Sequence, residues 1–544
     1  MVLTAMAPVP TTVCKGVRGE RPRRIPVDSV WVQERLVRDG ESLWQQDPVW
    51  RDMVDSLRDF PDGLEVLEVC GGVGSAFSGF TSCLGQRRGR VIMAGHFDTD
   101  ERLAEAMLHM HGNHDALFLG AAGDILTRPV EDFPSCHVLV SGPPCPPWSS
   151  KGKCLSFDDP RAAVFWKVVD IVRHQGQQDQ LMFFILENVP GLLKRHNGVS
   201  EAPVTILVKA LQDTLPDFDL EILLLNSLDF GLPQSRARVY IVGRRRELFP
   251  RGQPPPPRIF AGRVQLRDIL WPAAACAGKL YTPIQEQNLR DFKHKYRHWM
   301  TDPGQRGLFM VVDISRTPSD RTTWGNSPHE PDVVECLTAS GPALHVFALG
   351  EGQGELSVDR PIMPGERGLL QGQSQDLVNA VDGVPDIHQK RMFGNAMSVP
   401  VVGSVGGRML QALLRSHDPA TLAALLQRKP RIAADPSGHV VSVPDDSAQP
   451  AASDTRSAST SSGLPHDAAG SAEDHFCISS ISSIARTSGI TSSWSMSGSN
   501  GINITGSCRS ITSISMGISI NSISRLNCAN SSPVDDSTTF HICN

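Results

Sequence analysis

Aromatic residues and paired cysteines are scarce in this 544-residue chain, and each scarcity narrows the class of protein. Aromatic residues make up 6% of the chain, so the 40% of hydrophobic residues must build a largely aliphatic core. The 12 cysteines include no C-x-x-C pair, which argues against a zinc module and against a disulfide framework. We therefore expect no bound metal and a reducing, intracellular setting.

Long apolar runs and a net positive charge are also missing. No run of about 18 apolar residues occurs, so we expect no membrane span, and the first residues do not form the apolar segment of a signal peptide. A net charge of −6 argues against a globally basic nucleic-acid binder. Between Arg244 and Arg297, however, 12 Lys and Arg stand against four Asp and Glu. A domain that touches a polyanion would carry such a segment, and so would a solvated loop face.

Short apolar runs alternate with helical stretches from residue 63 to residue 243. This alternation predicts an α/β fold with a doubly wound parallel sheet. The expected strands are 64–69, 91–97, 136–140, 181–186, 220–225 and 239–242. The expected helices are 101–112, 161–174 and 201–213, with a late helix that opens at Gly394 and ends near His417.

The two ends of the chain have a different character. Residues 1–60 form an N-terminal extension, either a solvated tail or, over 30–58, one amphipathic helix. Residues 419–544 are predicted to be a disordered, low-complexity tail, because order fades after Lys429 and the stretch 477–532 is rich in Ser, Ile, Gly and Asn.

One cysteine among four prolines dominates the middle of the chain. The apolar run 136–140 leads into Ser141-Gly-Pro-Pro-Cys145-Pro-Pro-Trp148, and proline makes this a stiff, non-helical loop. Ligands bind at the carboxyl edge of open α/β sheets, where such a loop lies. A lone cysteine is more commonly a small buried hydrophobe, but at this edge the Cys145 thiol can act as a nucleophile.

A glycine-rich loop and two acids predict a nucleoside site at the same edge. The loop 68–75 follows the first strand, where glycine lets the backbone approach a ligand closely. Phe77 replaces the third glycine of the dinucleotide fingerprint, which argues against NAD. Asp98 ends the second strand, where an acid accepts hydrogen bonds from ribose, and Asp124 lies at the next strand edge. Together they favour a nucleoside cofactor without a pyrophosphate.

Charged residues mark two further strand ends. Glu187 follows the strand that ends at Leu186 and would face the same cleft as Cys145. A period of two projects Gln234, Arg236 and Arg238 to one side as the chain enters the 239–242 strand. At a catalytic edge these side chains can bind a phosphate or a base carbonyl.

In order and spacing, these motifs resemble the C5-cytosine methyltransferase family over about residues 63–417. The matching segments are 68–75, Asp98-Thr99-Asp100, Gly123-Asp124-Ile125, Pro143-Pro144-Cys145, Asp159-Pro160-Arg161, Glu187-Asn188-Val189, Gln234-x-Arg236-x-Arg238, 360–372 and 394–400. Glu68 and Cys70 stand where the family usually has Asp and Phe, Pro146 stands for the Gln after the cysteine, and Ala396 for a Ser. None of these departures removes a group that does chemistry.

The resemblance implies a Rossmann-like methyltransferase fold that uses S-adenosylmethionine. Residues 61–243 would form the first part of the catalytic domain, 244–374 a small target-recognition region and 375–418 the closing part. Its implied activity is that of a DNA (cytosine-5-)-methyltransferase. The implied catalytic residues are Cys145, Glu187, Arg236 and Arg238. Those of the cofactor site are Cys70, Gly72, Val73, Gly74, Asp98, Thr99, Asp124, Ile125, Pro144, Val164, Asn395 and Ala396.

In this resemblance each catalytic group has its own role. Cys145 would add to C6 of cytosine, Glu187 would bind N3 and the exocyclic amine, and Arg238 would hold O2. Arg236 and Ser149 would lie near the phosphate or the nucleophile loop. The implied partner is double-stranded DNA bound by a monomer, with Lys293, Lys295 and Arg297 contacting phosphates.

Two alternatives remain open. One is a tRNA cytosine methyltransferase, although the Cys-Phe-Thr signature of that branch is absent from residues 244–358. The other is an inactive nucleic-acid-binding paralogue, against which the intact Cys145, Glu187 and Arg238 count. A nuclear location is suggested only by the biased tail.

Overall fold

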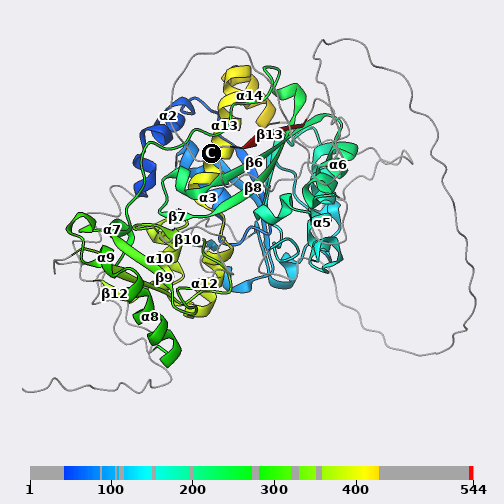
Figure 1. Cartoon of the computed structure of the whole chain (residues 1–544). Helices are drawn as coiled ribbons and strands as arrows, with labels where there is room; N and C mark the ends of the chain where they lie inside the picture. The colour runs from blue at the N-terminus through cyan, green and yellow to red at the C-terminus, as the bar shows by residue number, and fades with distance from the viewer. Residues whose placement is uncertain are drawn as a thin grey trace, which may run out of the picture. The chain divides into compact units, whose positions relative to one another are not determined.

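The computed structural model describes residues 42–85, 89–104, 107–108, 115–149, 155–195, 201–271, 281–319, 330–350 and 358–427, and the backbone of 538–542. An eight-stranded sheet in the order β13-β6-β8-β5-β4-β1-β2-β3 forms its centre (Figure 1). The strands are β1 Leu64–Val69, β2 Val91–Asp98, β3 Leu117–Leu119, β4 Val138–Ser141, β5 Phe183–Asn188, β6 Phe218–Asn226, β8 Ala237–Arg245 and β13 Thr538–Ile542.

The strand order reverses between β1 and β4, which is where open α/β sheets bind ligands. The predicted parallel pairing is confirmed for β3, β2, β1, β4 and β5. Strand β8 instead runs antiparallel to both β5 and β6, because the short link 227–236 can join only antiparallel neighbours. The start of β8 therefore meets the end of β5, where Glu187 pairs with Tyr240.

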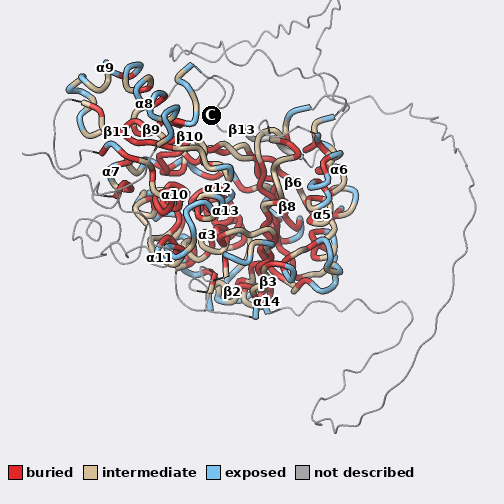
Figure 2. Tube along the Cα trace, turned by 90° about the horizontal axis from the view of Figure 1, so that it is seen from below, coloured by how far each residue is buried: buried red, intermediate tan, exposed pale blue. Residues whose placement is uncertain are grey.

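Helices cover both faces of the sheet, and the strands are accordingly apolar on both sides. Helices α3 (Ser75–Leu84) and α13 (Val399–Ser416) pack on one face, and α5 (Ala162–Gln177) and α6 (Pro203–Thr214) on the other. Alternate residues of β4 divide between the two cores, with Val140 in the first and Leu139 in the second. Figure 2 shows the resulting buried centre beneath an exposed helical exterior.

The predicted helices fit with local differences. Stretches 161–174 and 201–213 form α5 and α6. Of 101–112, the structure describes a short 3-10 turn, Glu101–Leu103, and a few further residues. The late helix begins at Val399 rather than Gly394, because Gly394 and Asn395 end a separate helix, α12 (Asp386–Asn395).

The N-terminal segment does not form the single helix predicted over 30–58. A 3-10 turn, Leu43–Gln46, is followed by helix α2 (Pro48–Ser56), which Asp47 caps. Trp44 and Trp50 are buried in the same core as α13. This part of the predicted extension therefore belongs to the hydrophobic core of the large sheet, and residues 1–41 lie outside the described range.

The predicted recognition region contains a small sheet of its own. Strands β9 (Phe309–Asp313), β11 (Leu344–Ala348) and β12 (Asp359–Pro361) pair antiparallel, and α8 (Pro283–Lys295) packs on them. The other helices described in this part are α7 Leu266–Ile269, α9 Arg297–Met300 and α10 Pro364–Leu369, and α11 Gln375–Ala380 follows in the predicted closing part. A two-residue strand, β10 (Val334–Glu335), pairs with β7 (Gln234–Ser235) and ties the region to the catalytic core.

The predicted boundary at residue 244 lies too early. Phe249 and Phe260 pack in the core that contains Trp50, and Arg408 of α13 donates hydrogen bonds to the carbonyls of Pro254 and Pro255. These apolar and proline residues cover α13, so the recognition region separates from the core only near α7.

The predicted tail also contains core elements. Helix α14 (Pro419–Leu426) buries Leu422, Leu425 and Leu426 in the α13 core. Strand β13 pairs parallel with β6, from Thr538 opposite Leu220 to Ile542 opposite Leu224. The rest of the predicted tail lies outside the described residues. In the described part of the chain, no helix is long and apolar enough to cross a membrane.

Candidate active site

The Cys145 loop is held rigidly at the carboxyl end of β4. The Asn188 side-chain amide at the end of β5 donates to the Pro143 carbonyl at 3.1 Å. The Cys145 carbonyl accepts from the backbone N–H groups of Trp148 and Ser149 at 3.1 and 3.0 Å. Trp148 is fully buried and anchors the loop in the α5 core. The Cys145 side chain thus has a fixed position and remains partly exposed.

Glu187 and Arg238 form an ion pair beside this loop, with Nε of Arg238 3.0 Å from Oε1 of Glu187. Both side chains are nearly buried, at 10% and 12% exposure. Burial alone would lower the pKa of Arg238, but Cys336, Glu187 and Cys145 raise it above its ordinary value. The structure therefore brings together the three residues that the sequence analysis placed around the base.

The pKa of Cys145 is raised above that of an ordinary thiol. Burial is the main cause and the charge of Glu187 adds to it, while Arg238 and Arg236 act in the opposite direction. A nucleophilic thiol works best with a lowered pKa, and this site does not provide one before a substrate is bound. The protein alone therefore holds Cys145 largely protonated at neutral pH.

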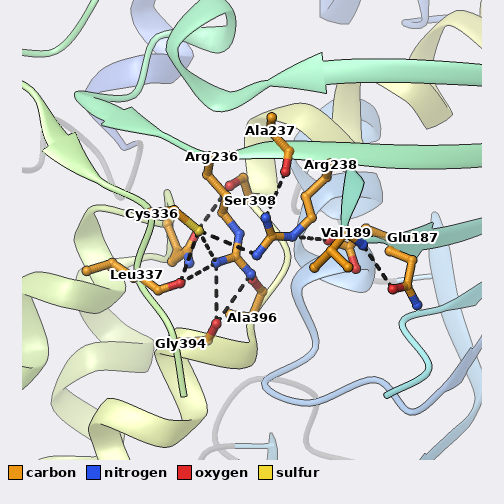
Figure 3. A network of polar contacts seen from close by, with 12 residues as sticks. Glu187, Val189, Arg236, Ala237, Arg238, Cys336, Leu337, Gly394, Ala396 and Ser398 are labelled. Carbon is orange, nitrogen blue, oxygen red and sulfur yellow. Dashed lines mark hydrogen bonds and ion pairs between the residues drawn. The ribbon is translucent and has the colours of Figure 1, made fainter. Parts of the chain in front are cut away.

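Arg236 is expected near the phosphate or the nucleophile loop, and its charge does act on Cys145. Its guanidinium is buried and donates to the carbonyls of Leu337 at 2.7 Å, Ala396 at 2.8 Å and Gly394 at 3.3 Å. Figure 3 shows the Arg236 guanidinium beside these carbonyls and the Arg238 guanidinium between Cys336 and Glu187. Arg236 thus ties the segment at Leu337 to the end of α12.

Cys336 is a site residue that the sequence analysis missed. Its Sγ lies 3.6 Å from Nη1 of Arg236 and 3.6 Å from Nη2 of Arg238 (Figure 3). Burial would raise the pKa of this thiol, but the two guanidinium groups lower it below its ordinary value. The only available signal was the tripeptide Cys336-Leu337-Thr338, which shares its first and last residues with the Cys-Phe-Thr signature.

The glycine loop and Asp98 meet at the ends of β1 and β2, where Gly72 borders open space, and we call this place the Asp98 recess. Gly72 has φ +57°, and nothing lies within 4 Å of the position where its Cβ would be. Its N–H donates to Oδ2 of Asp98 at 2.9 Å, while Oδ1 of Asp98 accepts from the Asp100 N–H at 2.9 Å. Cys70 also has a positive φ, 54°, which is uncommon for a residue other than glycine.

Asp124 lies on the same side of the sheet. Burial raises the pKa of the Cys70 thiol, and the charges of Asp98 and Asp124 raise it further, so the three side chains lie near one another. Gly123 packs tightly on the end of β2, since a Cβ there would lie 2.1 Å from the Asp98 carbonyl oxygen. This contact fixes the position of Asp124.

The remaining predicted cofactor residues divide into two groups. Those with exposed or partly exposed side chains are Thr99, Pro144, Val164 and Asn395. Those with side chains buried in hydrophobic clusters are Val73, Ile125 and Ala396, so their backbones are the groups that can face a ligand. Among the residues that the structure describes, no group of three or more His, Cys, Asp or Glu could hold a metal ion.

Comparisons with known proteins identify the family of the chain. The family model for C-5 cytosine-specific DNA methylases matches residues 66–411. The chain belongs to this family. Its relatives include the type II methyltransferase M1.ScrFI of Lactococcus lactis subsp. cremoris, which is 27% identical over 301 residues, 54% of this chain and 67% of that protein.

Other relatives match over shorter lengths. The type II methyltransferase M.MthTI of Methanothermobacter thermautotrophicus is 35% identical over 150 residues, which are 26% of this chain and 42% of that protein. Among solved structures, the Dnmt2 methyltransferase of S. pombe aligns over 64% of this chain and 98% of its own, with 18% identity and a TM-score of 0.39.

S-adenosylmethionine is the methyl donor of this family, and the recess fits it. Open space beside Gly72 gives an amino-acid or ribose group access to the backbone, and the Asp98 and Asp124 carboxylates can accept from hydroxyl and amine groups.

Proposed function

We propose that this chain methylates C5 of cytosine in double-stranded DNA through a covalent adduct on Cys145. The observation that carries the proposal is the meeting of Cys145, Glu187 and Arg238 at one sheet edge, beside the Asp98 recess. A nucleophile, a carboxylate and a guanidinium in one recess are the groups that attack on a pyrimidine ring requires.

In the proposed mechanism Cys145 loses its thiol proton to solvent, and the thiolate sulfur forms a bond to C6 of cytosine. The electron pair of the C5–C6 double bond then moves toward C5, which becomes nucleophilic. Glu187 binds N3 and the exocyclic amine and stabilises the charge that develops there, while Arg238 donates to O2. Bound S-adenosylmethionine supplies the electrophilic methyl group. Loss of the C5 proton to a base then restores the double bond and expels the Cys145 thiolate.

Access to C5 requires that the cytosine leave the duplex, at a cost of a few kcal/mol. The base then enters the site between the Cys145 loop and Arg238, while Asp98 holds the ribose of the cofactor and Gly72 lies close to its methionine end. Arg236 acts indirectly, since it fixes the end of α12 next to Asn395.

A covalent trap tests the proposal. Duplex DNA that carries 5-fluorocytosine cannot lose a proton from C5, so the adduct with Cys145 should persist in denaturing gels and map to the Cys145 peptide. If the protein binds this DNA but forms no covalent adduct, it is an inactive nucleic-acid-binding protein instead.

A tRNA substrate is a second candidate, favoured by one observation. Cys336-Leu337-Thr338 lies in the site, with the Leu337 N–H bonded to Gln234 at 3.0 Å and its carbonyl bonded to Arg236. Because a related tripeptide occupies the site, the absence of an intact Cys-Phe-Thr signature is weaker evidence against a tRNA substrate than the sequence alone suggests. Methyl transfer from labelled S-adenosylmethionine to duplex DNA and to tRNA, measured side by side, separates the two substrates.

Replacing Asp98 by alanine should weaken cofactor binding by about 1–3 kcal/mol, the loss for one partner of a charged hydrogen bond. The carboxylate orients Gly72 and is the proposed ribose acceptor, so both functions disappear together. Calorimetry with S-adenosylmethionine measures the change, and Asp55→Ala on the exposed face of α2 serves as the control. An Asp98→Ala protein with wild-type affinity would move the ribose site elsewhere.

The basic helix α8 requires a change in the predicted phosphate contacts. Lys293 is paired with Asp359 at 2.6 Å, whereas Arg290, Lys295 and Arg297 are exposed. Arg244 and Arg246 pair with Asp219 in the catalytic core, so part of the basic excess is neutralised inside the protein.

Replacing Arg290, Lys295 and Arg297 together by glutamine should flatten the salt dependence of DNA binding. Each phosphate contact that is lost lowers the log–log slope by about 0.9, because fewer counterions are released. DNA affinity from low to moderate salt is the measurement, and Arg58→Gln, in the exposed turn after α2, is the control. Identical slopes for the triple variant and wild type would mean that this surface faces solvent.

A further inference from the structure

Two buried polar side chains lie beneath the glycine loop. Glu68 and His96 are register partners on β1 and β2, so both project to the same face of the sheet. They are 1% and 0% exposed, and Nδ1 of His96 lies 2.8 Å from Oε2 of Glu68. The mechanism above uses neither residue.

Glu68 also binds the start of the helix that follows the loop. Its Oε1 accepts from the Phe77 N–H at 2.9 Å. Helix α3 begins after Gly74, which has no side chain to cap the free N–H groups of the first turn. One carboxylate therefore connects the His96 ring on β2 with the helix end beyond the loop.

His96 in turn supports the loop from below. A Cβ on Gly71 would lie 2.5 Å from Cε1 of His96, so the loop backbone rests directly on the ring. Two residues along the same strand, Asp98 accepts from the Gly72 N–H. Strand β2 thus holds the loop at two points: His96 supports Gly71, and Asp98 binds Gly72. Only Asp98 faces the proposed cofactor site.

We propose that Glu68 and His96 are positioning residues, which hold the glycine loop and Asp98 in the geometry that binds the nucleoside cofactor. A buried carboxylate is stable only while it stays hydrogen-bonded. Without His96, Glu68 takes up a new partner and releases Phe77, and Gly71 loses its support. The role rests on the proposed cofactor site, and it concerns cofactor affinity rather than chemistry at the base.

The test compares His96→Leu with His96→Asn, because the asparagine amide N–H occupies nearly the place of Nδ1. His96→Leu should weaken the binding of S-adenosylhomocysteine in calorimetry by about tenfold or more, the factor for a lost hydrogen bond to a charged group. The KM for S-adenosylmethionine should rise by the same factor, with kcat at saturating cofactor close to wild type. His96→Asn should recover most of the affinity.

A matched control lies at the opposite, amino-terminal ends of the strands. His137 is also fully buried beside a glutamate of β1, and its Nδ1 accepts from the Glu65 N–H at 2.9 Å. His137→Leu should lower thermal stability and leave the affinity for S-adenosylhomocysteine unchanged. Equal losses of affinity in His137→Leu and His96→Leu would overturn the positioning role, since they would reflect general destabilisation.

A second variant serves if His96→Leu does not fold. Gly71→Ala brings a Cβ to 2.5 Å from Cε1 of His96 and 2.9 Å from Cβ of Glu68, so it should displace the loop and weaken cofactor binding. Unchanged affinity in Gly71→Ala overturns the role. Wild-type protein that fails to bind S-adenosylhomocysteine overturns the proposed function itself, which is a different result from wild-type binding with an unaffected His96→Leu.

Discussion

Serine in place of Cys145 is expected to abolish methyl transfer while cofactor binding stays nearly intact. A hydroxyl is a far weaker nucleophile than a thiolate, and loss of a nucleophile commonly lowers turnover by about a thousandfold or more. The loop should keep its shape, because the Asn188 contact to Pro143 and the buried Trp148 do not involve the thiol. The measurements are turnover with duplex DNA and the affinity for S-adenosylhomocysteine.

Cys83→Ser is the matched control for this experiment. The Cys83 thiol is buried in α3 and donates to the Gly403 carbonyl at 3.2 Å, a hydrogen bond that serine can also make. This variant should methylate DNA normally. A Cys145→Ser protein that keeps more than about a tenth of wild-type turnover would contradict the nucleophile assignment. Such a small loss is what replacement of a thiol outside the reaction produces.

The residues at strand ends were predictable because parallel strands share one carboxyl edge. Cys145, Glu187 and Asp98 each follow an apolar run, so the order of strands alone brings them to one side of the sheet. Their association required no knowledge of side-chain contacts. The glycine loop followed from the same reasoning, since glycine after a first strand favours close approach of a ligand.

Neither the direction of β8 nor the bonding partners of Arg236 and Arg238 were predictable in this way. An apolar run reads alike in both directions, and only the short link before it makes β8 antiparallel. A period of two placed Arg236 and Arg238 on one side, yet their partners lie far along the chain or on another strand, at Leu337, Gly394 and Glu187. Such contacts depend on tertiary packing, which local pattern does not contain.

Buried polar pairs escaped prediction for a similar reason. His96 stands in an apolar strand and its partner Glu68 stands in another, 28 positions away. Each is unremarkable alone, and only the parallel register of β1 and β2 brings them together. The phosphate contacts predicted on α8 were affected in the same way. Lys293 was predicted to bind DNA, but it pairs with Asp359, which lies 66 residues further along the chain.

Glutamine in place of Glu187 is expected to raise the reactivity of the Cys145 thiol and to lower the rate of methylation. The charge of Glu187 raises the pKa of Cys145, whereas Arg238 lowers it. Without the carboxylate, the pKa of Cys145 falls, and the thiolate fraction at a given pH rises. Iodoacetamide should therefore alkylate Cys145 faster in Glu187→Gln than in wild type, as measured by mass spectrometry of the Cys145 peptide.

Methylation by the same variant should nevertheless fall by about 10²–10³-fold, the usual loss for one group that stabilises developing charge. Glutamine keeps the size of Glu187 and a carbonyl oxygen for Arg238, so the fold should persist, but it cannot carry the charge that compensates a proton on N3 of the base. Turnover at saturating DNA and cofactor is the measurement. If alkylation and methylation both rise, thiol acidity alone limits the reaction and Glu187 has no role at the base. If alkylation does not change, the carboxylate does not act on Cys145, and the two groups do not share one recess in solution.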